Sequence, residues 1–216
     1  MPVMHDDQHG TAVVVLAAMT NGAWFIGKDL TSLRVVISGA GAAGIAVCAM
    51  LLSVGISDVI LLDSKGIISS HRQDLNAIKT EFEAKTNPRN VQGGIGEALQ
   101  EANVFIGVSS GTIAEENFAR MSPDSMIFAM SNPDPEIDPV VAKKYAKVVA
   151  TGRSDYPNQI NNVLAFPGIF RGLLDAQAHK ITDDLLVAAA NAIADCVSQS
   201  QLNASFIVPS VFDPQV

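Results

Sequence analysis

The first strong pattern in the chain is an almost uninterrupted apolar stretch over residues 10–26. Apolar residues on every side predict a buried helix rather than one with a solvent face. Asp6 and Asp7 stand in front of it, where carboxylates can cap free amides and meet the positive end of the helix dipole. Its most apolar part, residues 12–19, is too short to cross a bilayer and follows acidic rather than basic residues. We therefore expect neither a membrane helix nor a signal peptide.

Beyond residue 30, short runs rich in β-branched residues alternate with segments of helical spacing. The expected strands cover residues 33–38, 58–62, 104–108, 125–130 and 147–151. Helical spacing appears at 45–54 and again at 71–84. Thr112, with a glutamate three residues later, fits a capping box, and Asp138 before a proline fits a helix N-cap. This alternation predicts an α/β fold, a doubly wound, mostly parallel Rossmann-type sheet with helices on both faces.

The last third of the chain changes character, because two helical patterns follow each other without a strand between them. They cover residues 166–179 and 182–200, and Thr182 before two aspartates is a strong start signal for the second. No repeat, low-complexity segment or linker interrupts the sequence. We expect one domain over residues 1–216, with a leading segment and helix (1–30), a Rossmann core (31–165) and C-terminal helices with a tail (166–216).

The candidate chemistry starts at a glycine-rich loop between the first expected strand and the helix after it. The loop reads Gly39, Ala40, Gly41, Ala42, Ala43, Gly44. A G-x-G-x-x-G pattern alone is a weak signal, but a strand before it and a helix after it make it specific. The first glycine allows the tight turn, the second lets the backbone approach a pyrophosphate, and the third lets helix and strand pack closely. The loop therefore predicts a dinucleotide site, with the phosphates at the helix N-terminus.

An acidic residue at the end of the next strand completes this fingerprint. Asp63 follows Gly44 by 19 residues, where a carboxylate can hydrogen-bond the ribose hydroxyls of the cofactor. A carboxylate there favours NAD over NADP, but Lys65 can offset it, so both cofactors remain open. Ser109 lies in a second glycine loop, residues 107–111, and is a candidate cofactor contact; an ordinary glycine turn explains that loop equally well.

Composition and charge narrow the class of partner. A net charge of -8 removes the electrostatic attraction to polyphosphate, so we exclude nucleic acid. Apolar residues make up 48% and charged residues 17%, as in globular chains. The two cysteines, Cys48 and Cys196, stand far apart in apolar stretches, which favours neither a disulfide framework nor a cysteine metal cluster. A protein of the reducing cytoplasm, without a membrane partner, is expected.

Taken in order, several segments resemble the malic enzymes, in particular the smaller bacterial type. The similar segments are residues 2–12, 36–44, 61–67, 129–133, 151–168 and 207–216. The resemblance implies oxidative decarboxylation of malate to pyruvate, with hydride transfer to NAD or NADP and a divalent cation, Mg²⁺ or Mn²⁺, polarising the carbonyl oxygen. It also implies a metal ligand at Asp7, a supporting catalytic partner at Asp6, and substrate or nicotinamide contacts at Asn132 and Asn162. Without the resemblance, the aspartates would be helix caps and the asparagines turn residues.

The same resemblance implies that half of such an enzyme is missing from these residues. The family's catalytic Lys and Tyr, its malate-binding Arg and two further acidic ligands belong to an N-terminal domain, and the acidic residues of 134–136 and 183–184 fit a turn and a helix start instead. We expect the chain alone to be inactive, and to self-associate as a homo-oligomer through its apolar first helix. A non-catalytic NAD-binding or regulatory module and a malolactic-type decarboxylase are the alternatives.

Overall fold

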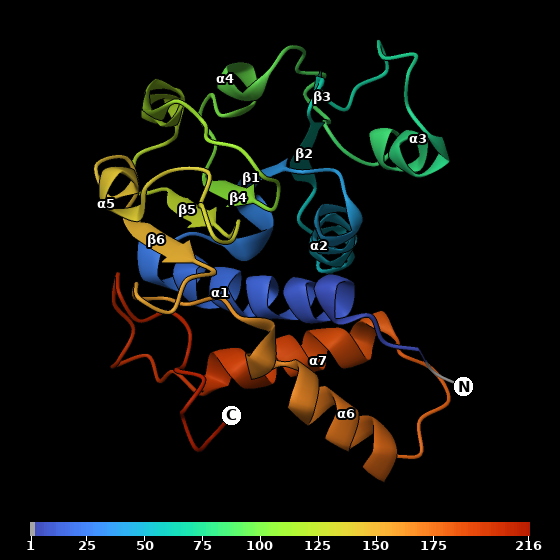
Figure 1. Cartoon of the computed structure of the whole chain (residues 1–216), viewed down its shortest axis with the longest axis vertical. Coiled ribbons are helices and arrows are strands. Elements are labelled where there is room, and N and C mark those ends of the chain that lie inside the picture. Colours follow the sequence, from blue (N-terminus) through green and yellow to red (C-terminus); the bar gives the residue numbers. More distant parts are fainter. Residues whose placement is uncertain (1–2) are drawn as a thin grey trace.

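A six-stranded sheet forms the centre of the fold (Figure 1). The structure is a computed structural model that describes residues 3–216; Met1 and Pro2, and with them the start of the segment 2–12, lie outside the described residues. The spatial order is β3-β2-β1-β4-β5-β6, with only β3 antiparallel to its neighbour. The strands are β1 (Arg34–Ser38), β2 (Asp58–Asp63), β3 (Gly66–Ile67), β4 (Val104–Gly107), β5 (Met126–Ala129) and β6 (Val148–Thr151). This confirms the predicted fold class.

Helices cover both faces of this sheet. They are η1 (Asp6–Gly10), α1 (Thr11–Ile26), η2 (Leu30–Ser32), α2 (Ala42–Ser53), α3 (Ala77–Glu83), α4 (Ile95–Ala98), η3 (Glu115–Arg120), α5 (Pro139–Ala142), η4 (Asn162–Leu164), α6 (Phe166–Asp175) and α7 (Asp183–Asp195). One apolar core joins the sheet to α1, α2, α6 and α7, and the other joins it to α4, η3 and α5. Alternate strand residues supply the two cores, because successive side chains of a strand point to opposite faces.

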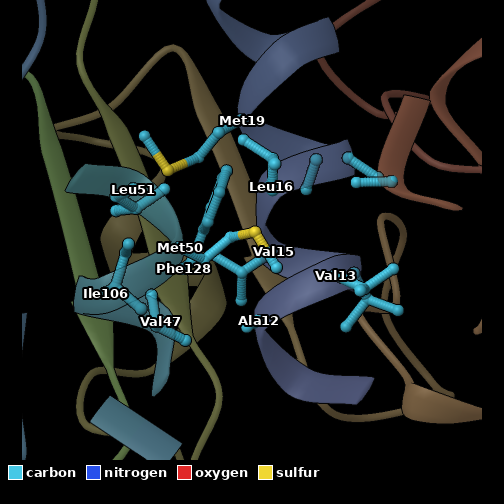
Figure 2. Packing of buried hydrophobic residues seen from close by; sticks show 14 of the residues in the cluster. Ala12, Val13, Val15, Leu16, Met19, Val47, Met50, Leu51, Ile106 and Phe128 are labelled. Atoms are coloured by element: carbon cyan, nitrogen blue, oxygen red, sulfur yellow. The ribbon is translucent and has the colours of Figure 1, made fainter. Parts of the chain in front are cut away.

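Helix α1 is buried between the sheet and α7 (Figure 1). Figure 2 shows Val15 and Met19 on its sheet side, towards Met50 of α2 and Phe128 of β5, while Val13 points the other way. With η1 it runs from Asp6 to Ile26, 21 residues, and an 18-residue window of it has a mean hydropathy of 1.3. The helix is therefore longer than expected and meets the length and composition of a membrane span. Yet 78% of that window is buried inside the protein, as in a core helix.

The structure corrects two expectations about α1. Asp6 and Asp7 do not cap it, because the chain already turns as a single π-helical turn at η1, whose N-cap is His5 and carries no side-chain cap hydrogen bond. Among residues 3–216, α1 presents no large apolar patch to solvent, since α7 covers the face turned away from the sheet. The predicted ground for self-association is therefore wrong, and a homo-oligomer stays a prediction. Exposed apolar side chains instead follow α6, at Phe166, Phe170 and Leu174.

Three predicted helix starts have different outcomes. Asp138 and Thr182 cap α5 and α7, as expected. The capping box at Thr112 is wrong: η3 begins only at Glu115, and its N-cap is Ala114. The predicted helix over 71–84 is also too long. Only α3 is helical, because Asn76 is its N-cap and accepts a hydrogen bond from Lys79 N, and the residues before Asn76 form a loop.

Two buried asparagines tie the C-terminal region to the rest of the fold. Asn21 of α1 donates to the carbonyl oxygens of Ala194 and Ile207, at 3.0 and 2.9 Å. Asn158, after β6, donates to Val149 O and Ala204 O, and its own Oδ1 accepts a hydrogen bond from Ile207 N. Because these amides replace the water that the buried carbonyls would otherwise bind, the tail is part of the core.

Candidate cofactor and substrate site

The glycine loop joins β1 to α2 at the carboxyl edge of the sheet. At its first and last glycines the neighbouring backbone leaves no room for a side chain. Gly39 adopts φ +123, and a Cβ there would lie 2.9 Å from Val108 O. A Cβ at Gly44 would overlap Gly39 O. The loop is therefore tightly packed at both ends, as a close strand-to-helix turn requires.

Gly41, the middle glycine, differs because nothing lies within 4 Å of the position that its Cβ would occupy. It is the N-cap of α2, with φ -93 and ψ -165, an extended conformation that any residue adopts. Free backbone N–H groups and the positive end of the helix dipole meet at this point. The open space beside Gly41 therefore suits an anionic group such as a pyrophosphate.

A cleft of about 410 Å³ runs from this loop along α2. Residues from the loop, from α2, from η1 and from the start of α3 line it: Gln8, Ala40, Gly41, Ala42, Ile45, Ala46, Ala49, Asn76, Ile78 and Lys79. The carboxyl edge beside β1 is the switch point where doubly wound sheets bind ligands. The loop, the helix N-terminus and the cleft together fit a dinucleotide.

Asp63, at the end of β2, is held by two cations that the sequence did not reveal as its partners. Arg72 and Lys79 form ion pairs with its carboxylate at 2.7 and 2.6 Å. Partial burial by itself raises the pKa of Asp63, but the hydrogen bonds from Arg72 and Lys79 outweigh it and hold the pKa at about 2. Lys65, which was expected to offset the repulsion between this carboxylate and the phosphate of NADP, directs its side chain to Asp74, while its backbone N–H donates to Asp63 Oδ1 at 2.9 Å. The carboxylate is thus ionised and neutralised by its surroundings.

A second cleft, of about 580 Å³, lies at the same sheet edge and brings five of the predicted site residues together, the loop residue Ala43 among them. Asp6 and Asp7 line it from η1, Asn132 from the loop after β5, and Asn162 from η4. The other lining residues are Thr11, Ala43, Val108, Met130, Ser131, Gly152, Ile160 and Asn161. Segments more than 150 residues apart in sequence therefore meet here, as Asp6 and Asn162 do. Their functional roles stay predictions.

Asn162 fastens η1 to this cleft. Its Nδ2 lies 3.3 Å from both Asp6 O and Asp6 Oδ2, and its Oδ1 accepts a hydrogen bond from Thr11 Oγ1 at 3.2 Å. The second carboxylate oxygen, Asp6 Oδ1, is buried without a hydrogen-bond partner among the described residues. Asp7 is exposed. Asp6 is therefore held by the chain, whereas the carboxylate of Asp7 is accessible from outside.

These carboxylates do not amount to a divalent-cation site. Mg²⁺ and Mn²⁺ require several oxygen ligands, and within residues 3–216 no three His, Cys, Asp or Glu side chains gather as a group. The residues of this chain alone therefore do not fit the metal, although Asp7 is placed to give one carboxylate.

Ser109 and Ser131 share a buried partner that the sequence did not identify. Glu136, expected in a simple turn, has no exposed surface and accepts hydrogen bonds from Ser109 N and Ser131 N. Ser109 also lies 3.4 Å from Ser38 Oγ at the end of β1. No local pattern marks Glu136, because its environment is created by the approach of two loops. The peptide bond between Asn132 and Pro133 in the second loop is cis.

Comparison with known proteins links this site to one family. A family model described as malic enzyme, NAD binding domain matches residues 8–148 and 145–214. The chain is 48% identical to an NAD-dependent malic enzyme of Geobacillus stearothermophilus and 47% identical to a bifunctional malic/malolactic enzyme of Bacillus subtilis. Both alignments cover 100% of this chain, but only 45% and 53% of those proteins.

Solved structures give the same result. A malic enzyme of Pyrococcus horikoshii superimposes with a TM-score of 0.94 at 42% identity, covering 99% of this chain and 52% of that one. An NAD-dependent malic enzyme of Thermotoga maritima gives 0.93 at 43% identity, covering 99% and 56%. The chain thus spans about half the length of these four relatives.

Proposed function

The chain belongs to the family of malic enzyme NAD-binding domains, and we propose that it is the NAD(P)-binding part of an enzyme that oxidatively decarboxylates malate to pyruvate. The observation that carries this proposal is that consecutive residues line the two clefts: Ala42 and Gln8 line the first, and their chain neighbours Ala43 and Asp7 line the second. The glycine loop and the N-terminus of α2 lead along the sheet edge to a second cleft, which Asn132 and Asn162 line. A dinucleotide bound at the loop thus directs its far end towards polar side chains suited to a small hydroxy acid.

Each group of residues has a distinct part in this proposal. The N-terminus of α2 binds the pyrophosphate, and the Asp63 cluster lies at the adenosine end, beside the second strand. Asn132 and Asn162 orient the substrate or the nicotinamide, and Asp6 stays fixed through Asn162. The bound cofactor supplies the acceptor for the hydride of the malate carbinol carbon. In the whole enzyme Asp7 would give one carboxylate to a divalent cation that other groups complete.

This division of labour predicts that the chain binds cofactor but turns over no malate. Reduction of NAD or NADP by malate, followed by absorbance with Mn²⁺ present, tests it. We expect no turnover above a control without protein, and NADH binding unchanged in Asp7→Ala. Steady turnover by the purified chain that Asp7→Ala abolishes would contradict the proposal.

Malolactic chemistry is the second candidate, because a relative at 47% identity is described as a bifunctional malic/malolactic enzyme. That reaction converts malate to lactate without net NADH. The test is to add an N-terminal domain from the family that restores turnover and then to identify the products. Lactate without NADH would favour the malolactic reaction, and pyruvate with NADH would favour the oxidative reaction.

A non-catalytic binding module remains a further candidate, since residues 3–216 do not supply a complete cation site. Such a module binds NADH with an affinity that malate and Mg²⁺ do not change, even when the N-terminal domain is present. Tighter NADH binding on adding malate and Mg²⁺ to the reconstituted pair would exclude it.

A further inference from the structure

Glu136 is a fully buried acidic residue that the proposed reaction does not use. Its exposed fraction is 0%, and its carboxyl packs against Gly107 so closely that a Cβ on that glycine would overlap it. Ser109 N lies 3.2 Å from Oε1 and Ser131 N lies 3.3 Å from Oε2. One side chain thus bridges the loop after β4 and the loop after β5.

Both loops line the candidate site. Val108 and Ser131 face the 580 Å³ cleft, and Asn132, proposed to contact substrate or nicotinamide, follows Ser131 directly. A polar pocket of about 300 Å³ lies between the same loops, lined by Ser110, Gly111, Thr112, Ser131, Asn132, Pro133 and Asp134. The separation of the two loops, and hence the place of Asn132, therefore depends on the Glu136 side chain.

The hydrogen bonds of Ser131 determine which form of Glu136 fits. The Ser131 hydroxyl donates to Ser109 O at 2.6 Å, and a carbonyl oxygen can only accept. The same Oγ lies 2.9 Å from Glu136 Oε1. A hydroxyl has one proton, so once it is given to Ser109 O, the contact with Oε1 needs a proton on the carboxyl. A protonated Glu136 satisfies both contacts, whereas a carboxylate would place two sets of lone pairs against each other.

We propose that Glu136 is a positioning residue that holds the β4 and β5 loops together as a neutral carboxylic acid, donating its proton to Ser131 Oγ. The positioning role rests on the proposed function, because it matters only if these loops bind cofactor and substrate. The protonation state does not rest on it. Glu136 does not touch the reacting atoms in this account and acts through Ser131 and Asn132.

The surroundings of Glu136 agree with a neutral acid. Burial raises the pKa of its carboxyl, and the hydrogen bonds from its own backbone amide, from Ser131 and from Ser109 only partly oppose this. None of the groups that shift the pKa carries a charge. The acidic neighbours on the same turn are Asp134, which is exposed, and Asp138, whose carboxylate accepts from the amides of α5. Within residues 3–216 the carboxyl has no ion pair.

The sign of the pH dependence follows from this raised pKa. The unfolded chain releases the Glu136 proton near its ordinary pKa, while the folded protein keeps it to higher pH. The stabilising contribution is therefore complete below the ordinary pKa and is lost as pH rises through the folded value. Cofactor affinity should fall over that same upper range, because the ionised side chain repels Ser131 Oγ.

Infrared spectroscopy and NADH titration of the wild-type chain, Glu136→Gln and Glu136→Ala together test the proposal. Glu116→Gln, at an exposed glutamate of η3, is the matched control. At neutral pH the wild type and Glu116→Gln should show the carbonyl band of one protonated carboxyl, and Glu136→Gln should lack it. A neutral amide replaces most of the acid's hydrogen bonds, so Glu136→Gln should bind NADH within about threefold of wild type.

The titrations separate a positioning role from a purely structural one. Glu136→Ala should weaken NADH binding by about tenfold or more, because both serines lose their shared partner. Glu136→Gln should also remove the loss of affinity at high pH that the wild type and the control retain. Absence of the protonated band, or a tenfold loss in Glu136→Gln at neutral pH, would overturn the neutral-acid assignment. If wild type binds NADH but Glu136→Ala binds it equally well, the positioning role is wrong; if wild type itself binds none, the proposed function fails, and the positioning role with it.

Discussion

Arg72 holds both carboxylate oxygens of Asp63, with Nη1 2.7 Å from Oδ1 and Nη2 3.1 Å from Oδ2. Lys79 adds a third contact, at 2.6 Å from Oδ2. The acidic residue of the dinucleotide fingerprint is therefore part of an ion-pair network that fastens the loop after β3 and the start of α3 to the end of β2. Asp63 therefore supports the local structure at this end of the sheet.

This network makes the stability of the fold depend on pH in acid. With its pKa held at about 2, below the ordinary value of 3.8, Asp63 stabilises the folded state above pH 4 or so, and this contribution disappears as pH falls towards 2. Asp63→Asn should lower the free energy of unfolding at neutral pH by about 2 kcal/mol. Urea denaturation between neutral pH and acid measures both effects. The exposed Asp195→Asn should keep the acid slope; an equal slope in wild type and Asp63→Asn would contradict the prediction.

Gly44→Ala should destabilise the fold rather than affect cofactor binding alone. The added Cβ would overlap Gly39 O, a backbone atom that cannot move without shifting the loop. We expect a loss of about 3 kcal/mol or more in urea denaturation. Gly172→Ala in α6, where nothing lies within 4 Å of the new Cβ, should be neutral or stabilising by about 0.5–1 kcal/mol. Equal stability of the two variants would show that Gly44 is not tightly packed.

Two asparagines close in sequence should differ sharply in their effect on stability. Asn158 is buried and makes three hydrogen bonds to the backbone, two of them into the C-terminal tail, so Asn158→Ala should cost about 2–3 kcal/mol. Asn161 accepts only a local bond from Val163 N at the start of η4, and Asn161→Ala should cost about 1 kcal/mol or less. Thermal unfolding of both variants checks this, and a larger loss in Asn161→Ala would contradict it.

The sequence was sufficient for the five parallel strands and for the loop at the centre of the sheet, but not for β3, a two-residue strand too short to leave a pattern. Strands such as β1 and β2 are short β-branched runs, and Gly39, Gly41 and Gly44 stand between a strand and a helix at the spacing of a tight strand-to-helix turn. Such patterns can be recognised in the sequence because contacts between residues close in the chain determine these elements. Helix starts at Asp138 and Thr182 were predictable for the same reason.

The remaining features depend on contacts between distant segments. Arg72 reaches Asp63 from the loop after β3 and Lys79 reaches it from α3, and Glu136 is buried only because the loops after β4 and β5 approach each other. The caps expected at Asp6 and Asp7 failed because Asn162, far along the chain, holds η1 in a turn of its own. The pattern of side chains along the sequence does not reveal such distant partners, so the hydrogen bonds and ion pairs around the site could be identified only from the structure.

The most direct measurement is a fluorescence titration of NADH and NADPH into the chain and into Gly41→Val. Gly41 has an extended backbone and open space beside its Cα, so valine fits the fold but occupies the place of the pyrophosphate. Gly172→Ala is the matched control. We predict that the wild type and the control bind at least one of the two cofactors, and that Gly41→Val folds normally but binds at least tenfold more weakly. Equal binding by Gly41→Val, or no binding by the wild type, would contradict the assignment of this loop as the cofactor site.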